Sequence, residues 1–127
     1  MRKRTFIKAL AVAGSSPASL FAQSSSGRPI RMLVPLPAGT SNDFATRAII
    51  PAVGQELRQP ISIENKAGGN GVIATVDVVK AVPDGLTLMC GSLSPLATNV
   101  AFIRNLPYDP LRDLTPIAGA TLTNHVL

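Results

Sequence analysis

The sequence predicts an α/β fold built on a parallel sheet. Between residues 29 and 102, short runs of β-forming residues alternate with runs whose apolar residues recur at helical spacing. This alternation is typical of a parallel sheet covered by helices. The three connections that lead from a predicted strand into a predicted helix are residues 35–43, 65–71 and 91–95, and all are rich in Gly, Ser, Thr or Asn.

The first strand–helix unit is bounded by prolines. Residues 29–34 predict a strand, and Pro35 and Pro37 end it because proline has no N–H to donate to a sheet. Apolar residues spaced three and four apart then predict a helix over residues 43–57. Pro51 lies inside this pattern, so we expect it to kink or split the helix.

Two further units follow. Residues 61–65 predict a second strand, and a glycine-rich loop leads from it into a helix over residues 72–81. Residues 86–90 predict a third strand, and residues 96–102 a third helix. The third strand has no polar alternation, so we expect it to be covered on both faces.

The C-terminal part carries weaker signals. Residues 106–114 contain two prolines and predict extended loop and turn, whereas residues 117–120 and 126–127 suggest further strand material.

The N-terminus predicts an exported protein. Arg2, Lys3, Arg4 and Lys8 precede a short apolar run that ends near Ala22 at a small residue, which is the layout of a secretory signal. We therefore expect a signal peptide at 1–22, a linker at 23–28 and the folded part at 29–127. Residues 3–8 resemble a twin-arginine signal with Lys in place of the first Arg, so Sec export stays open. An amphipathic helix of a cytosolic protein is less favoured because no polar face recurs.

The charge balance follows from that signal. The chain has twelve basic and seven acidic residues, and four of the basic ones lie in the signal. The rest of the chain then has eight basic and seven acidic residues. Most of the basic excess that would indicate a nucleic-acid partner therefore belongs to the signal peptide. We expect no nucleic-acid partner.

The residue types that carry catalysis are sparse. Cys90 is the single cysteine, in an apolar run typical of a buried thiol, and His125 is the single histidine, close to the C-terminus. The carboxylates are scattered singly, so we predict neither an enzyme nor a metal site, and no cofactor. One alternative is a nucleotide site at residues 69–74, which match a relaxed G-x-G-x-x-A. That site would also need an acidic residue at the end of the next strand, which the sequence lacks.

The loops favour the binding of an anion. Thr40, Ser41 and Asn42 precede a helix whose first N–H groups have no helical partner and whose dipole is positive there. Such an end accepts a carboxylate without a formal cation. Ser92 and Ser94 suggest a second helix N-terminus of this kind, after the third predicted strand. The alternative, that these residues only cap their own helices, is equally open, and both can hold together.

Four segments, taken in order, carry a resemblance to a known family. They are PIRMLVPLPAGTSND at 29–43, ENKAGG at 64–69, PDGLTL at 83–88 and LPYDPLRD at 106–113. Together they resemble the substrate-binding proteins of tripartite tricarboxylate transporters, also called the Bug family of periplasmic receptors. The resemblance covers nearly all of residues 28–127.

The resemblance implies a periplasmic binding protein type II-like fold with two lobes that close around a small di- or tricarboxylate. This chain would supply the N-terminal part of the first lobe, a parallel-sheet lobe that is incomplete relative to the family fold. The receptor would be a monomer that passes its ligand to the membrane permease subunits of a secondary transporter. The resemblance and the loops together give these ligand-binding residues: Gly39, Thr40, Ser41, Asn42, Asp43, Ser92, Leu93 and Ser94.

This sequence departs from the family in three ways. The family often has Gly-Gly-Ser or Gly-Ser-Thr near Gly39-Thr40-Ser41. The family often has Arg-Pro-Gly where this chain has Lys66-Ala67-Gly68. Family members also run to about twice this length or more. A truncated, non-functional remnant of such a receptor therefore stays open as an alternative.

Overall fold

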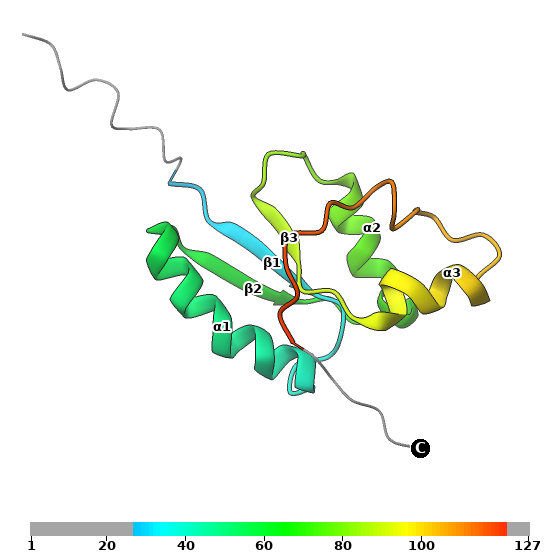
Figure 1. Cartoon of the computed structure of the whole chain (residues 1–127), viewed down its shortest axis with the longest axis horizontal. Helices are drawn as coiled ribbons and strands as arrows, with labels where there is room; N and C mark the ends of the chain where they lie inside the picture. Colours follow the sequence, from blue (N-terminus) through cyan, green and yellow to red (C-terminus); the bar gives the residue numbers. More distant parts are fainter. Residues whose placement is uncertain (1–26, 122–127) are drawn as a thin grey trace, which may run out of the picture.

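The computed structural model describes residues 27–121, which form a three-stranded parallel sheet with helices packed against it (Figure 1). The elements, in chain order, are β1 (Ile30–Val34), α1 (Ser41–Leu57), β2 (Ile61–Asn65), a 3₁₀ turn (Gly69–Gly71), α2 (Val72–Lys80), β3 (Thr87–Met89), a π-helical segment (Ser94–Thr98) and α3 (Asn99–Phe102). The strand order is β2-β1-β3. The predicted α/β class and parallel sheet are confirmed.

β1 is the central strand and the centre of the core. It pairs with β2 from Ile30 opposite Ile61 to Val34 opposite Asn65, and with β3 on its other edge. Leu33 and Val34 are 0% exposed because both faces of this strand are covered. α1 packs against β1 and β2, while α2 packs against β1 and β3.

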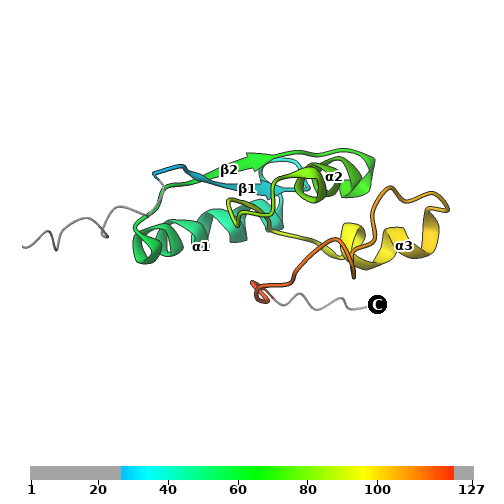
Figure 2. The same ribbon diagram turned by 90° about the horizontal axis from the view of Figure 1, so that it is seen from above.

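The strand order fixes where the helices lie. The chain moves from β1 to one neighbour through α1, and then back across β1 to the other neighbour through α2. Right-handed crossovers in these two directions place α1 and α2 on opposite faces of the sheet. Figure 2 shows α1 below the strands. The chain thus reverses its direction of winding at β1, which is a topological switch point.

The kink predicted at Pro51 does not split the helix. α1 continues from Ser41 to Leu57 through Pro51, whose side chain is exposed. α1 packs against β1 and β2, and this tertiary packing offsets the local penalty of proline. The helix ends at Arg58, which adopts the left-handed conformation with φ 51° and donates its N–H to the carbonyl of Gln55.

Two expectations about the later strands are wrong. β3 is shorter than the predicted strand, and all its residues are half-buried rather than covered on both faces. It forms an edge of the sheet of the described residues, where it pairs with β1 alone. Residues 117–120 form no strand in the described part of the chain, and they are exposed. Residues 126–127 lie outside the described residues.

Four charged side chains join the sheet to α2. Arg31 on β1 contacts Glu64 at 2.8 Å and Asp77 at 3.4 Å, and Lys66 contacts Asp77 at 2.6 Å and Glu64 at 3.5 Å. The bonds lower the pKa of Glu64, chiefly through Arg31, and that of Asp77, chiefly through Lys66. Because these groups are one-third or more exposed, water screens the pairs and each stabilises the fold only modestly.

The N-terminal predictions are not tested by this structure. The signal peptide at 1–22, residues 23–26 of the linker and His125 lie outside the described residues. Within the described residues, no helix combines the length and the apolar character that a membrane crossing requires.

Candidate functional site

The candidate site lies at the carboxyl ends of the strands, beside the switch point. In open parallel sheets ligands bind in the crevice that forms where the connections diverge. Here the loop after β1 leads to α1, and the loop after β3 leads to the helical segment that begins near Ser94. The Asn42 side chain joins these two loops, because its Nδ2 donates to the carbonyl oxygen of Gly91 at 3.2 Å.

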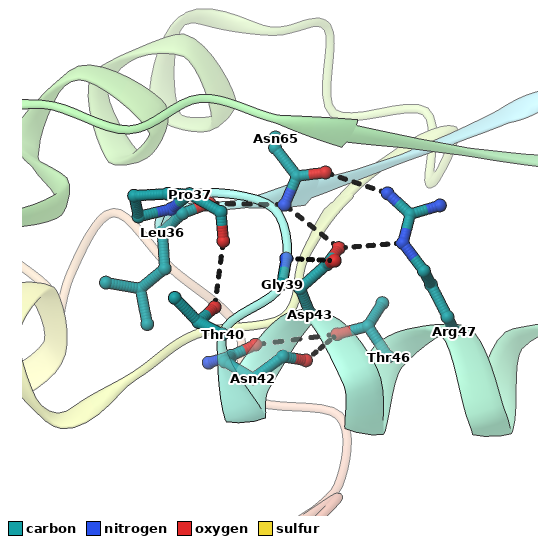
Figure 3. Close-up of polar contacts among 9 residues, drawn as sticks. All are labelled: Leu36, Pro37, Gly39, Thr40, Asn42, Asp43, Thr46, Arg47 and Asn65. Atoms are coloured by element: carbon teal, nitrogen blue, oxygen red, sulfur yellow. Dashed lines mark hydrogen bonds and ion pairs between the residues drawn. The ribbon is translucent and has the colours of Figure 1, made fainter.

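The loop after β1 is organised by the buried carboxylate of Asp43 (Figure 3). One oxygen accepts from the Gly39 N–H at 2.9 Å, and the other accepts from Arg47 Nε at 2.9 Å and Asn65 Nδ2 at 3.0 Å. Asp43 is 3% exposed. The hydrogen bond from Arg47, followed by those from Gly39 and Asn65, lowers the pKa of Asp43 to about 2. The carboxylate is therefore ionised at neutral pH, and its charge is already neutralised within the chain.

Asn65 at the end of β2 completes this arrangement. Its Nδ2 also donates to the carbonyl oxygen of Leu36 at 3.2 Å, and its Oδ1 accepts from Arg47 Nη2 at 2.9 Å. Figure 3 shows the Asn65 amide above the loop and the Arg47 guanidinium at its side. The ends of β1 and β2 are thus tied to the first turns of α1.

The N-terminus of α1 has no side-chain cap. Thr40 occupies the N-cap position, but its hydroxyl donates back to the carbonyl of Pro37 at 2.9 Å instead of accepting from the helix. The side chain of Asp43 accepts from Gly39, which precedes the cap. The first backbone bond of the helix runs from the Phe44 N–H to the Thr40 carbonyl at 2.9 Å, so the N–H groups of Ser41, Asn42 and Asp43 have no helical partner. They carry the positive end of a 17-residue helix dipole.

The loop after β3 contributes a hydroxyl without a partner. The Ser92 Oγ atom is buried, and no described residue bonds to it. Buried hydroxyls in proteins nearly always have a partner, so this one is available to a group from outside the described chain. Ser94 is half-buried, whereas Leu93 is 68% exposed.

The structure brings the two predicted groups of site residues to one end of the sheet. Ser41 and Gly39 are exposed, Thr40 and Asn42 are half-buried, and Asp43 is buried. The Asn42–Gly91 hydrogen bond places residues 39–43 next to residues 91–94. Arg47 and Asn65 were missed by the sequence reasoning. The spacing of Asp43 and Arg47, four apart in a helix, is the one signal that could have indicated an ion pair.

Two hollows of the described surface lie away from these loops. A groove of about 510 Å³ runs between the C-terminal half of α1 and the start of β2, and its lining includes Ile50, Gly54 and Ile61. A smaller one of about 240 Å³ lies beside Leu96 and Leu111. Neither hollow lies where the carboxyl ends of the three strands come together. The candidate site is therefore located by the strand order of the sheet and not by a hollow. Within residues 27–121, no cluster of His, Cys, Asp and Glu could hold a metal ion.

The predicted nucleotide alternative finds no support in the geometry. Residues 69–71 form a 3₁₀ turn before α2, and the Asn70 side chain is bonded to Asn99. The glycines permit this tight turn, since Gly69 and Gly71 have φ of 55° and 88°.

Comparison with known proteins decides the family. The family model described as "Tripartite tricarboxylate transporter family receptor" matches residues 45–127. This chain belongs to that receptor family. Its relatives include BugT of Bordetella pertussis, which is 40% identical over 92 residues, covering 72% of this chain and 28% of BugT.

Solved structures show that the fold is part of a periplasmic binding protein. MatC from Rhodopseudomonas palustris, solved with bound malate, is 38% identical with a TM-score of 0.67 over 69% of this chain and 30% of that one. A second R. palustris protein, solved with adipate, is 31% identical with a TM-score of 0.64, and the alignment covers 68% and 29%. The periplasmic binding protein BugD is 28% identical with a TM-score of 0.60, over 67% and 28%. The chain spans about a third of the length of these receptor relatives.

Proposed function

We propose that this chain forms part of the first lobe of a periplasmic receptor that captures a small carboxylate for a tripartite tricarboxylate-type transporter. The proposal rests on the uncapped N-terminus of α1, which opens beside the loop after β3 at the switch point of the sheet. Family membership and two relatives solved with the dicarboxylates malate and adipate support the ligand class.

In this proposal the predicted site residues divide into two roles. The first-turn N–H groups, the Ser41 hydroxyl and the unpartnered Ser92 hydroxyl would bond to the ligand carboxylate. Gly39, Thr40, Leu93 and Ser94 would line the cleft. Asp43 and Asn42 would act indirectly, because their polar groups already hold the loop. Neutralisation of Asp43 by Arg47 removes a charge that would repel an anion.

The wider assignment follows from the same proposal. The receptor would be a monomer in the periplasm, exported by the signal at residues 1–22, and it would deliver its ligand to membrane permease subunits. It would carry a solute rather than catalyse a reaction, and it would need no cofactor. The remnant alternative predicts that the chain does not fold, so far-UV circular dichroism with a cooperative thermal transition would argue against it.

The central test removes one N–H group of the helix terminus at a time. Ser41 is the first helical residue, where proline is tolerated, and Thr40 before it already has the extended conformation, φ −80° and ψ 164°, that proline demands. Isothermal titration of the full chain with malate and with adipate should show binding. Ser41→Pro should weaken it roughly 10- to 100-fold, the value of one hydrogen bond to a charged group.

Two controls make this test specific. Ser41→Ala keeps the N–H and removes only the hydroxyl, so it should cost less affinity than Ser41→Pro, and Ser92→Ala measures the second loop. The uncharged diamide of malate should not bind. A folded chain that gives no heat with either dicarboxylate, or a Ser41→Pro variant that binds as tightly as Ser41→Ala, would contradict the proposed site.

A further inference from the structure

The turn between β2 and α2 has a strained centre. Asn70 lies in the left-handed region with φ 55° and ψ 39°, a conformation that a residue with a side chain adopts at a cost. Gly69 and Gly71 on either side also have positive φ. Glycine adopts such angles without strain, so the cost falls on Asn70, and we expect contacts of Asn70 to offset it.

A buried asparagine from a distant segment bonds to this turn at both of its polar ends. Asn99, the first residue of α3, is 1% exposed. Its Nδ2 donates to the Asn70 carbonyl oxygen at 3.0 Å, and its Oδ1 accepts from Asn70 Nδ2 at 2.8 Å. A carbonyl can only accept and an NH₂ group donates, so the reciprocal pattern fixes the orientation of the Asn99 amide.

A second contact supports the same turn. The ring of Pro95 packs so closely on Gly71 that a Cβ atom at Gly71 would lie 3.1–3.2 Å from three ring atoms. The Tyr108 hydroxyl, which is buried, donates to the Pro95 carbonyl at 2.8 Å and lies 3.5 Å from Asn99 Nδ2. The helical residues after β3 therefore pack directly against the turn after β2, through Pro95 and Asn99.

We propose that Asn99 is a positioning residue that locks the turn at Gly69–Gly71 to the helical segment after β3, so that two of the three loops at the switch point form one rigid wall. Asn99 acts through Asn70 and does not itself contact the ligand, since its amide is buried and occupied. The benefit for carboxylate affinity rests on the function proposed above, whereas the locking of the turn does not.

Hydrogen exchange of the full chain, resolved by segment, tests the locking directly. In Asn99→Ala the amides of residues 69–72 should exchange at least tenfold faster than in the natural chain, while those of β1 change less than twofold. Asn99→Asp keeps an acceptor for Asn70 Nδ2 but turns a second, charged oxygen towards the Asn70 carbonyl oxygen, so it should accelerate exchange of residues 69–72 at least as much as Asn99→Ala. If Asn99→Ala does not fold, the same comparison is made in the Asn70→Gly background described below. The exposed Asn105 supplies a matched control, Asn105→Ala, with no change in either segment.

A rescue variant separates positioning from a general structural role. Glycine adopts the left-handed conformation without strain, so in an Asn70→Gly background Asn99→Ala should accelerate exchange of residues 69–72 far less. A merely structural asparagine would speed exchange throughout the chain, with no rescue. Uniform acceleration, or unchanged exchange at residues 69–72, would overturn the proposal.

Titration with malate then distinguishes this inference from the proposed function. If the natural chain does not bind malate but the exchange results hold, the ligand proposal fails and the locked turn stands. If malate binds, Asn99→Ala should weaken it at least fivefold, with Asn105→Ala unchanged. Equal binding by the natural chain and Asn99→Ala would overturn the role of Asn99 in the site.

Discussion

At the scale of single residues, Asp43 places a negative charge in a buried position at the first turn of α1. The charge is tolerated because Arg47, the Gly39 N–H and Asn65 all donate to it. Without these donors a buried carboxyl group would favour its neutral form. One carboxylate therefore shapes the loop after β1 and joins it to the end of β2.

This arrangement predicts a specific dependence of stability on pH. The pKa of Asp43 is lowered from 3.8 to about 2, so the folded chain binds this proton less readily than the unfolded chain. The stabilisation is complete above about pH 4 and is lost as the pH falls towards about 2. Urea denaturation between about pH 2 and 4 should show the free energy of unfolding falling as the pH falls. Asp43→Asn should make this dependence on pH less steep.

In Asp43→Asn, the free energy of unfolding should still depend on pH because of other carboxyl groups. Glu64, Asp77 and Asp84 also have lowered pKa values, the last chiefly through the Leu86 N–H. Asp113→Asn, which changes an exposed carboxyl group in the C-terminal loop, is the matched control. If Asp43→Asn and Asp113→Asn show the same slope as the natural chain, Asp43 does not contribute as described.

Substitution of Gly71 tests how closely the turn after β2 packs on Pro95. Gly71 and Gly85 have similar positive φ, 88° and 77°, but a Cβ atom would meet the Pro95 ring at Gly71 and nothing within 4 Å at Gly85. Both alanine variants should lose stability from backbone strain, and Gly71→Ala should lose about 1–3 kcal/mol more from overpacking. Chemical denaturation measures the difference, and equal losses would show that the contact with Pro95 is readily relieved.

At the scale of elements, α1 shows how packing overrides a local rule. Pro51 removes the N–H that would bond to the carbonyl of Arg47, yet the helix runs without a break to Leu57. Sequence periodicity located this helix correctly, but it could not show that the helix, packed on β1 and β2, would continue unbroken through Pro51.

The cost of this proline can be measured. Pro51 is exposed, so Pro51→Ala removes no buried contact and should raise the free energy of unfolding by about 1–3 kcal/mol. Ala48→Gly, at another exposed position of α1, should lower it by about 1 kcal/mol and reports on helix propensity alone. A loss of stability in Pro51→Ala would mean that the proline supports a shape of the helix that alanine does not.

At the scale of the whole molecule, the core of the described residues is small. The buried apolar side chains are Ile30, Leu33, Val34, Ile50, Ala74 and Tyr108, together with Pro35 and Pro95. Large apolar side chains elsewhere are exposed, among them Phe44 at 65%, Phe102 at 81% and Leu111 at 91%. Exposed apolar surface of this extent promotes association with other apolar molecules.

This surface predicts binding of an apolar dye. The natural chain should enhance the fluorescence of anilinonaphthalene sulfonate, and the double variant Phe102→Ser, Leu111→Ser should reduce the enhancement by roughly half while stability changes by less than about 1 kcal/mol. Leu33→Ser, at a fully buried position, should instead abolish the cooperative transition. A folded chain without dye fluorescence would contradict the exposure of this surface.

The sequence by itself determined the elements and their order. β2 has the bounds that its residues predicted, β1 and α2 differ from prediction by one residue, and the loops predicted to bind an anion lie between the strands and helices where their composition placed them. Periodicity, proline and glycine act over a few residues, so they can be read from the chain directly. The family resemblance rested on motifs of the same local kind and is confirmed.

The tertiary structure decided which side chains meet. Asp43 and Asn65 are 22 residues apart, Asn70 and Asn99 are 29 apart, and Asn42 and Gly91 are 49 apart. These contacts exist because the strand order brings the carboxyl ends of β2, β1 and β3 side by side, and no local pattern encodes that order. The half-buried edge position of β3, and the Ser92 hydroxyl that has no partner among the described residues, follow from the same arrangement, because burial and hydrogen bonding depend on neighbours that are distant in the chain.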